Sequence, residues 1–356
     1  MAYSGTIGQT VVNVQTLIDH AVRRCGKLAE EITSEQQITA RESLFFLLSA
    51  LANKGINYWA ISKKVFGLKP DQYVYKLPLG SIDVLNALYR RLNRPTPNAT
   101  GSYTASSGVV ENAFDSDVDT ICQQTAPNGY IAVNYGDSNE VYAGSIGILP
   151  GASGAFHILL EWSNDGVTWN LLKDCESTTW VDNEWLWYDI EIGQTCQYYR
   201  MRETGGNTLA VREFFVGNNS TEITMARLNR DDYTNLPNKN FTANQPYQYW
   251  FDRTIPQPTI YLWPAPSDPF IQMTIWYSRQ IMDVGALTDE LEVPQRWYEA
   301  TIFMLSHRLS LELPAVPDAR IAYLEKMANQ FLYEAEEEER DKSPIYFAPN
   351  ISVYTR

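Results

Sequence analysis

The residues best suited to chemistry are the oxygen-bearing side chains that alternate between Asn112 and Thr120. Asp115, Asp117 and Asp119 occupy every second position, and such a loop can wrap a hard cation that takes roughly 6 to 8 oxygen ligands, as Ca²⁺ does. The loop lacks the Gly and the terminal Glu of an EF-hand. An acidic loop that only faces water has the same composition, so these residues alone do not establish a metal site.

The other candidate residues do not form a catalytic pattern. His20, His157 and His307 have no partner at the spacing of a known motif, and isolated histidines are more often structural than catalytic. The chain has no G-x-x-x-x-G-K loop, no G-x-S-x-G elbow and no H-E-x-x-H sequence. We therefore predict that the protein is not an enzyme and has neither catalytic nor cofactor-binding residues.

Length and composition limit the remaining classes. A chain of 356 residues predicts two domains that each bury a core. Its apolar runs are far shorter than the ~20 residues needed to span a bilayer. The first residues lack the pattern of a signal peptide, so we expect synthesis in the cytoplasm and no membrane contact. The four cysteines include no C-x-x-C pair, which favours buried thiols over disulfides or zinc.

Charge is distributed unevenly along the chain. Residues 100–219 contain 4 Lys and Arg against 16 Asp and Glu, and therefore hold −12 of the total charge of −14. The rest of the chain is nearly neutral. The acidic total argues against tight wrapping of nucleic acid, which requires neutralised phosphates. A channel through which DNA passes without binding remains compatible with this charge.

Hydrophobic periodicity predicts helices at both ends of the chain. One apolar stripe runs from Asn13 to Gly26, and a second helix begins at Ser34, where Gln37 completes a capping box, and continues to Gly55. A shorter third helix is expected over 56–66. Two more are expected over 295–311 and 318–339.

Between the helices, strands are expected over 73–77, 247–251 and 271–277. Residues 82–92 are ambiguous between strand and helix. The turn-rich tracts 94–102 and 216–220 delimit a segment of β type. These features predict four parts: 1–100, an inserted domain at 101–219, 220–342, and a C-terminal arm at 343–356. The fold class expected is α+β multidomain, with a mainly helical host, small β elements and an inserted all-β domain.

The inserted segment resembles a discoidin domain, the galactose-binding-like β-sandwich of coagulation factors and carbohydrate-binding modules. The matching motifs are Ala113–Thr120, Ile131–Gly136, Trp162–Trp169, Tyr199–Arg202 and Val211–Phe214. The resemblance implies a jelly roll in which Asp115, Asp117, Thr120 and Glu213 clasp a structural Ca²⁺. Cys122 departs from the family, which usually has Trp there. Either glycan binding or a spacer without ligand is compatible with the motifs.

The host resembles the head-to-tail adaptor proteins of short-tailed bacteriophages. The resemblance follows the order of Leu17–Asp19, Gly55–Trp59, Tyr75–Pro78, Leu228–Tyr233, Leu236–Lys239, Leu262–Pro266 and Val293–Trp297. It implies a virion neck protein, assembled in the host cytoplasm, whose ring of typically twelve copies joins the portal protein to the tail nozzle around a DNA channel. The insert would then project outward towards tail fibres or glycans. The alternatives are a glycan-binding surface protein and a hydrolase.

The C-terminal region could contact other subunits. Glutamates crowd positions 334–339 at the negative end of the last helix dipole, where they form either a solvated end or a docking surface for a basic partner. The arm 343–356 is too apolar for a free tail. We predict a portal or neighbour interface that includes Glu336, Glu337, Tyr346, Phe347 and Tyr354.

Overall fold

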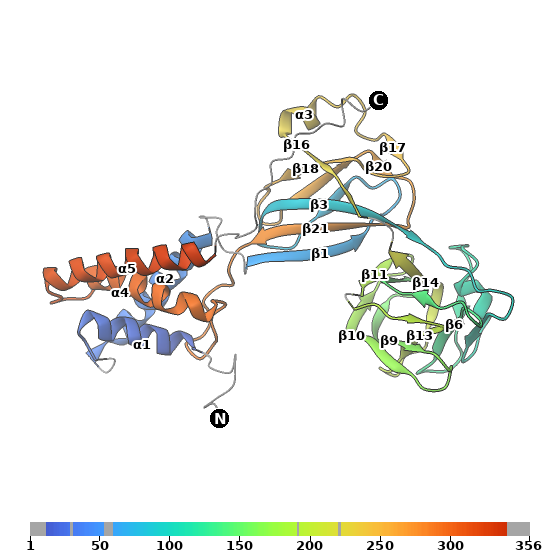
Figure 1. Cartoon of the computed structure of the whole chain (residues 1–356), viewed down its shortest axis with the longest axis horizontal. Coiled ribbons are helices and arrows are strands. Elements are labelled where there is room, and N and C mark those ends of the chain that lie inside the picture. The colour runs from blue at the N-terminus through green and yellow to red at the C-terminus, as the bar shows by residue number, and fades with distance from the viewer. Residues whose placement is uncertain (1–11, 29–30, 53–59, 191, 220–221, 340–356) are drawn as a thin grey trace. The chain divides into compact units, whose positions relative to one another are not determined.

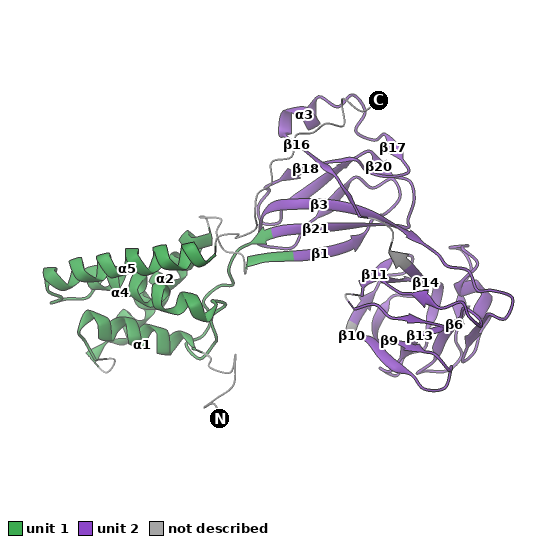
Figure 2. Ribbon diagram, viewed as in Figure 1, with its two compact units in different colours: residues 1–62, 278–356 green, residues 63–277 purple. Residues whose placement is uncertain are grey.

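A computed structural model of the chain describes residues 12–28, 31–52, 60–190, 192–219 and 222–339, without the side chains of 177, 218 and 219. The chain divides into two compact units (Figure 2). One contains residues 1–62 and 278–356, and the other contains residues 63–277. The first unit is built from the two ends of the chain, and the second from its middle.

The first unit is a helical bundle (Figure 1). Its described helices are α1 (Val14–Cys25), α2 (Ser34–Ala52), the 3-10 helix η4 (Gln295–Trp297), α4 (Tyr298–Glu312) and α5 (Asp318–Glu338). The predicted stripe of α1 is confirmed, because its six apolar residues are all buried in the core of the bundle. Asn13 caps the helix by accepting the Thr16 N–H at 2.8 Å, and Gly26 ends it with φ of 89°.

The capping box of α2 lies one residue earlier than predicted. Gln36 Oε1 accepts the Thr33 N–H at 3.1 Å, and Thr33 Oγ1 accepts the Gln36 N–H at 3.2 Å. This reciprocal pair satisfies two N–H groups at the start of the helix, so Thr33 replaces the predicted Ser34 as the cap. The expected end of the helix at Gly55 lies outside the described residues.

The second unit begins with a β-sandwich formed by host segments on both sides of the insert (Figure 1). Strands β1, β21 and β3 are neighbours in one sheet, with β15 beside β3, and β16, β18, β19 and β2 form the other. Core residues such as Val84, Met273, Ile260 and Leu262 are fully buried. The described host elements are β1 (Ile61–Gly67), β2 (Val74–Lys76), β3 (Ser81–Asn93), β15 (Ile223–Thr224), β16 (Ala226–Leu228), α3 (Arg230–Thr234), β17 (Thr242–Ala243), β18 (Gln248–Asp252), β19 (Thr259–Trp263), β20 (Ala265–Pro266) and β21 (Ile271–Arg279).

The insert is a second β-sandwich. One sheet has the order β10-β9-β13-β6-β4, and the other contains β14, β8 and β11, with β5 beside β14. Its core includes Trp180, Tyr199 and Phe214, each at most 1% exposed. The elements are β4 (Ser102–Ala105), η3 (Val110–Ala113), β5 (Cys122–Gln123), β6 (Tyr130–Asn134), β7 (Val141–Tyr142), β8 (Ser145–Pro150), β9 (Gly154–Ser163), β10 (Asn170–Trp180), β11 (Leu186–Asp189), β12 (Thr195–Cys196), β13 (Tyr198–Glu203) and β14 (Ala210–Asn219).

The prediction of a mainly helical α+β host was wrong. Strands make up 36% of the described residues and helices 26%, so β structure dominates. Residues 61–67, expected in a helix, form β1 beside β21, and the ambiguous segment 82–92 belongs to the long strand β3. Their partners lie about 200 residues away in the chain, and local periodicity carries no information about such pairing. None of the helices in the described ranges has the length and apolarity required to cross a membrane.

Candidate functional site

The loop that carries the predicted metal ligands hydrogen-bonds mainly to itself. Thr120 Oγ1 donates to Asp115 Oδ2 at 2.8 Å, the Asp117 N–H donates to Asp115 Oδ1 at 2.9 Å, and the Asp119 N–H donates to Asp117 Oδ1 at 3.0 Å. The last two bonds are Asx turns, in which the Asp side chain accepts from the backbone two residues further on. Asp115 and Asp117 are exposed. Their oxygens therefore shape the loop.

Glu213 on β14, the fourth predicted ligand, is 1% exposed. Its Oε2 accepts a hydrogen bond from Arg94 Nη2 at 2.5 Å. Burial raises the pKa of the Glu213 carboxyl above its ordinary value, Arg94 opposes that rise, and the charge of Asp115 adds to it. The charge of Asp115 thus acts on Glu213, but the group that binds the Glu213 carboxylate is the guanidinium of Arg94.

Arg94 contacts both Glu213 and the loop that carries the other predicted ligands. Its Nη1 donates to Ser116 Oγ at 2.8 Å and to the Phe114 carbonyl at 3.3 Å. Its Cζ lies 5.2 Å from the ring centre of Phe215 and 5.8 Å from that of Phe270, within the range of cation–π contacts. Arg94 lies in the tract predicted as a linker, and no role was predicted for it. The sequence indicates only that Arg94 is isolated in charge, because no Lys or Arg follows it until position 173, and it does not indicate the partner of Arg94.

This arrangement does not fit calcium. A calcium site collects oxygens around one dication, whereas here a partly buried guanidinium already binds the Glu213 carboxylate. Within the described part of the chain, no group of three or more His, Cys, Asp and Glu side chains could hold a metal ion. The remaining predicted ligands serve the turns of their own loop.

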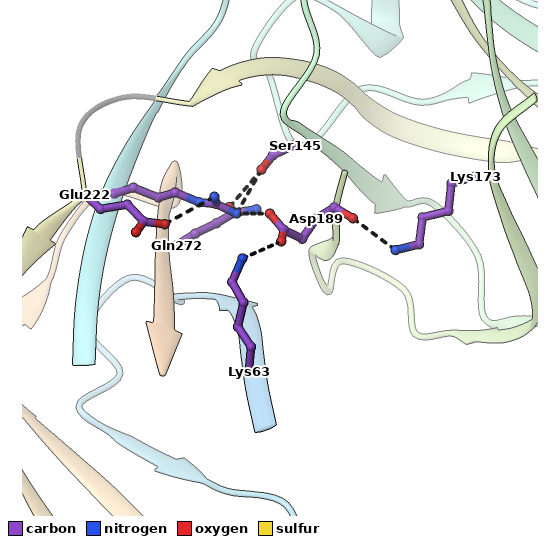
Figure 3. A network of polar contacts seen from close by, with 7 residues as sticks. Lys63, Ser145, Lys173, Asp189, Glu222 and Gln272 are labelled. Carbon is purple, nitrogen blue, oxygen red and sulfur yellow. Dashed lines mark hydrogen bonds and ion pairs between the residues drawn. The ribbon is translucent and has the colours of Figure 1, made fainter. Parts of the chain in front are cut away.

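A second arginine, Arg90 on β3, also reaches the insert. Arg90, whose side chain is 4% exposed, donates to Gln272 Oε1 at 2.8 Å and to Ser145 Oγ at 3.3 Å, and it is ion-paired with Asp189 and Glu222 (Figure 3). Two lysines complete this network. Lys63 Nζ lies 3.2 Å from Asp189 Oδ2, and Lys173 donates to the Asp189 carbonyl at 3.0 Å (Figure 3).

The charge of Asp189 is stabilised by this network. Although burial alone raises the pKa of its carboxyl, the hydrogen bond and charge of Arg90 and the charge of Lys63 hold that pKa below its ordinary value. Asp189 and Ser145 belong to the insert, whereas Arg90, Lys63 and Gln272 belong to the host sandwich. The network therefore joins the two sandwiches through buried polar contacts.

Aromatic side chains strengthen the same junction. Trp185 lies edge-on to Phe270 of the host at 5.6 Å, and Phe215 stacks on Phe270 at 5.0 Å between ring centres. Trp187 lies so close to Gly67 that a Cβ at that position would clash with its indole. Such aromatic contacts contribute both buried area and specific geometry. The insert is therefore packed against the host sandwich.

A polar cluster lies on the outer face of the five-stranded sheet. Arg200 Nε donates to Glu161 Oε2 at 2.6 Å, and Arg202 Nη2 donates to Glu161 Oε1 at 2.9 Å. The Cζ of Arg200 lies 4.0 Å from the ring centre of Trp169 and 5.9 Å from that of Tyr130. Although burial alone raises it, the two arginines hold the pKa of the Glu161 carboxyl below its ordinary value. We call these five residues the arginine–tryptophan face.

The arginines of this face have more N–H donors than their hydrogen bonds to Glu161 use. A guanidinium has five N–H donors, and in the hydrogen bond to Glu161 Arg200 uses its Nε. Arg202 is 35% exposed at its side chain and bonds through Nε and Nη2. Two positive charges share one carboxylate, so the face is locally positive within an acidic domain.

The predicted C-terminal interface lies only partly in the described chain. Glu336 and Glu337 are on α5, and Glu337 Oε1 accepts from the Tyr333 hydroxyl at 2.8 Å. Tyr346, Phe347 and Tyr354 lie outside the described residues. Glu339 is 5% exposed and accepts from Trp297 Nε1 at 3.1 Å, so this glutamate is neither part of a solvated end nor open to a partner.

The remaining candidate groups are the cysteines and the histidines. All four cysteines are buried and free, as predicted. His157 Nε2 lies 2.7 Å from Asp174 Oδ1 across neighbouring strands, and His20 is exposed on α1. No third group completes a catalytic arrangement around His157 among its described contacts.

No protein-family model matches the chain, and no curated protein matches its sequence. Solved structures similar to it include "CpGH89CBM32-6" of Clostridium perfringens, at 14% identity, 35% of this chain, 98% of that chain and a TM-score of 0.31. The chitosan-binding module 1 of a Paenibacillus chitosanase/glucanase is 21% identical over 36% of this chain and 99% of that chain, with a TM-score of 0.30. The family 32 module of Clostridium perfringens NanJ, in complex with galactose, is 18% identical over 36% and 99%, with a TM-score of 0.29.

These similar structures are carbohydrate-binding modules of the discoidin-like type predicted for the insert. Each match covers about a third of this chain. It does not identify a ligand. The comparisons give no support to the predicted resemblance to a phage adaptor.

Proposed function

We propose that the protein is a non-catalytic binding protein whose inserted sandwich contacts carbohydrate through the arginine–tryptophan face. The observation that carries the proposal is the pair Arg200 and Arg202 sharing Glu161 beside the ring of Trp169. An aromatic ring offers an apolar surface to the C–H face of a pyranose, and the guanidinium groups offer donors to its oxygens.

The charge of the face indicates the class of sugar. Two guanidinium groups against one carboxylate leave a net positive charge, and guanidinium binds carboxylate in a bidentate manner. We therefore expect sugars that carry a carboxylate, such as uronic acids, to bind more tightly than neutral sugars. Because the rest of the insert is acidic, weak nonspecific attraction of such sugars elsewhere on it is disfavoured.

Binding of the full chain to neutral and uronic-acid oligosaccharides, measured by titration calorimetry, tests this function. Trp169→Ala and Arg202→Gln should each weaken binding at least about tenfold, the scale of one lost charged hydrogen bond. Arg212→Gln is the matched control, because Arg212 pairs with Asp182 on another part of the insert. Wild-type protein that binds neither type of sugar, or equal binding by all variants, would contradict the proposal.

A second candidate function is the ring-forming neck adaptor expected from the sequence. One observation favours self-association: α2 exposes large apolar side chains, with Phe46 at 59%, Ile38 at 54% and Phe45 at 38%. Exposed apolar patches commonly mark protein interfaces. In this function copies of the chain would assemble through their helical units and join a portal to a tail nozzle around DNA.

Native mass spectrometry with and without a portal protein tests the adaptor function. Phe46→Glu should block assembly, whereas Val167→Glu, at an 81% exposed position of the insert, should not. Assembly that is equally normal in both variants, or a wild-type chain that stays monomeric with a portal present, would exclude this candidate. The carbohydrate titration is independent of this result, so either function can fail alone.

A further inference from the structure

The site around Arg94 has the parts of a cation site but contains a side-chain cation. The groups that face the guanidinium are the Glu213 carboxylate, the Ser116 hydroxyl and the Phe114 carbonyl. Two of them come from the loop that follows η3, and Glu213 comes from β14. We call these three groups the oxygen cradle. The carboxyl of Asp115 adds negative charge nearby.

We propose that Arg94 is a built-in cation of the inserted domain, supplied by the host to complete the oxygen cradle in place of a metal ion. Arg94 directly follows β3, the host strand from which the chain enters the insert. The paired bonds Nη1–Ser116 and Nη2–Glu213 tie the loop to β14 across the guanidinium, as a metal ion would tie its ligands.

The charge of Arg94 also works against a metal in the same cradle. Glu213 Oε1 is buried and has no hydrogen-bond partner among the described residues, so one ligand atom is unused. A dication at Oε1 would lie beside the guanidinium that binds Oε2 of the same carboxylate. Like charges at such a separation repel strongly in a partly buried site. The cradle therefore accepts one cation, and Arg94 already supplies it.

Because Arg94 belongs to the host, it couples the loop of the insert to the host, which a bound metal ion would not do. A metal ion binds an isolated domain as readily as an inserted one. Arg94 instead lies outside the strands of the sandwich and is held by the host ring of Phe270 as well as by the insert ring of Phe215. Closing the loop over β14 is therefore coupled to correct placement of the end of β3.

Hydrogen exchange of the full chain, read at the amides of residues 110–121 and of β14, tests the proposal. Wild-type protection should be unchanged by millimolar CaCl₂ or by EGTA. Arg94→Ala should speed exchange there roughly 100-fold, as expected when one partner of a buried ion pair is removed. Added methylguanidinium should restore protection in Arg94→Ala, because it re-supplies the missing cation.

Arg91→Ala is the control, since Arg91 lies on β3, three residues before Arg94, but is half exposed and forms a 3.4 Å surface pair with Asp268. It should leave exchange at these amides unchanged. Calcium-dependent protection of the wild type would overturn the proposal, and so would Arg94→Ala exchange equal to that of Arg91→Ala. If Arg94→Ala does not fold, the wild-type calcium measurement still decides, together with Arg94→Met/Glu213→Gln, which should fold and remain insensitive to calcium.

Discussion

Replacing Arg90 by Met tests whether the insert is bound to the host through buried charge. The substitution keeps much of the apolar volume of the side chain but removes the guanidinium from Asp189, Ser145 and Gln272. The Arg90 side chain is 4% exposed and that of Asp189 is 17% exposed, so the lost pair is largely buried. Asp189 would be left with Lys63 as its charged side-chain partner.

The expected loss of unfolding free energy depends on Lys63, the partner that Asp189 keeps. Removing one member of a buried ion pair costs about 3 to 5 kcal/mol, because the other charge stays buried. Since Lys63 remains 3.2 Å from Asp189, we expect the lower end, about 3 kcal/mol. Arg91→Met, which affects a half-exposed surface pair, should cost less than about 0.5 kcal/mol.

A double-mutant cycle isolates the pair. Arg90→Met, Asp189→Asn and the double variant should give a coupling free energy of about 1 to 3 kcal/mol between contacting residues. Because a chain of several domains can unfold in steps, hydrogen exchange at β8 and β11 is a better measure than one global transition. A coupling near zero, or Arg90→Met and Arg91→Met of equal stability, would show that the network does not bind insert to host.

Two further predictions concern titration and the helical unit. The folded pKa of Asp189 is lowered, so its stabilising contribution is complete above the unfolded pKa of about 3.9 and is lost as pH falls through the folded pKa. Wild-type protection at β11 should therefore decline below about pH 4 more steeply than that of Asp189→Asn, and parallel profiles would contradict this. In the bundle, Glu339→Ala leaves the buried Trp297 N–H without its acceptor and should lower the unfolding free energy by about 1 to 3 kcal/mol. The exposed Glu325→Ala should have almost no effect in the same denaturation experiment, and equal losses would refute the role of Glu339.

Local patterns predicted the elements whose determinants are local. The apolar stripe of α1 and the Gly26 that ends the helix are local features, and both are found as expected. Strand β1 was predicted as a helix because its pairing with β21 depends on residues far away in the chain. The same limit made the host appear mainly helical, since its sandwich brings together strands from both sides of a domain of more than 100 residues.

The residues of the candidate site show the same limit: those with local partners could be predicted, and those with distant partners could not. Asp115, Asp117 and Thr120 could be found from their spacing, because one loop carries them all. The roles of Arg94 and Arg90 could not be predicted from spacing, since their carboxylate partners Glu213 and Asp189 lie 119 and 99 residues further along the chain. The resemblance to discoidin domains indicated Glu213 but implied a metal ion as its partner. No motif describes a cation that is supplied by another domain.

The contacts between the insert and the host show how part of the negative charge of the insert is balanced. The inserted domain lies within residues 100–219, which hold an excess charge of −12, whereas the host is nearly neutral. Several carboxylates of the insert are paired with basic residues that precede the insert in the chain. These host cations are Lys63, Lys69, Arg90 and Arg94, which meet Asp189, Glu184 and Glu213.

A domain that folded and acted alone would need counter-charges of its own for its buried carboxylates. Glu161 has them in Arg200 and Arg202, whereas Glu213 and Asp189 obtain theirs mainly from the host. Insert and host sandwich therefore complement each other in charge as well as in aromatic packing around Phe270. The arginine–tryptophan face is thus carried on a domain fixed to its host, and a ligand bound there would be held in a defined orientation to the host sandwich.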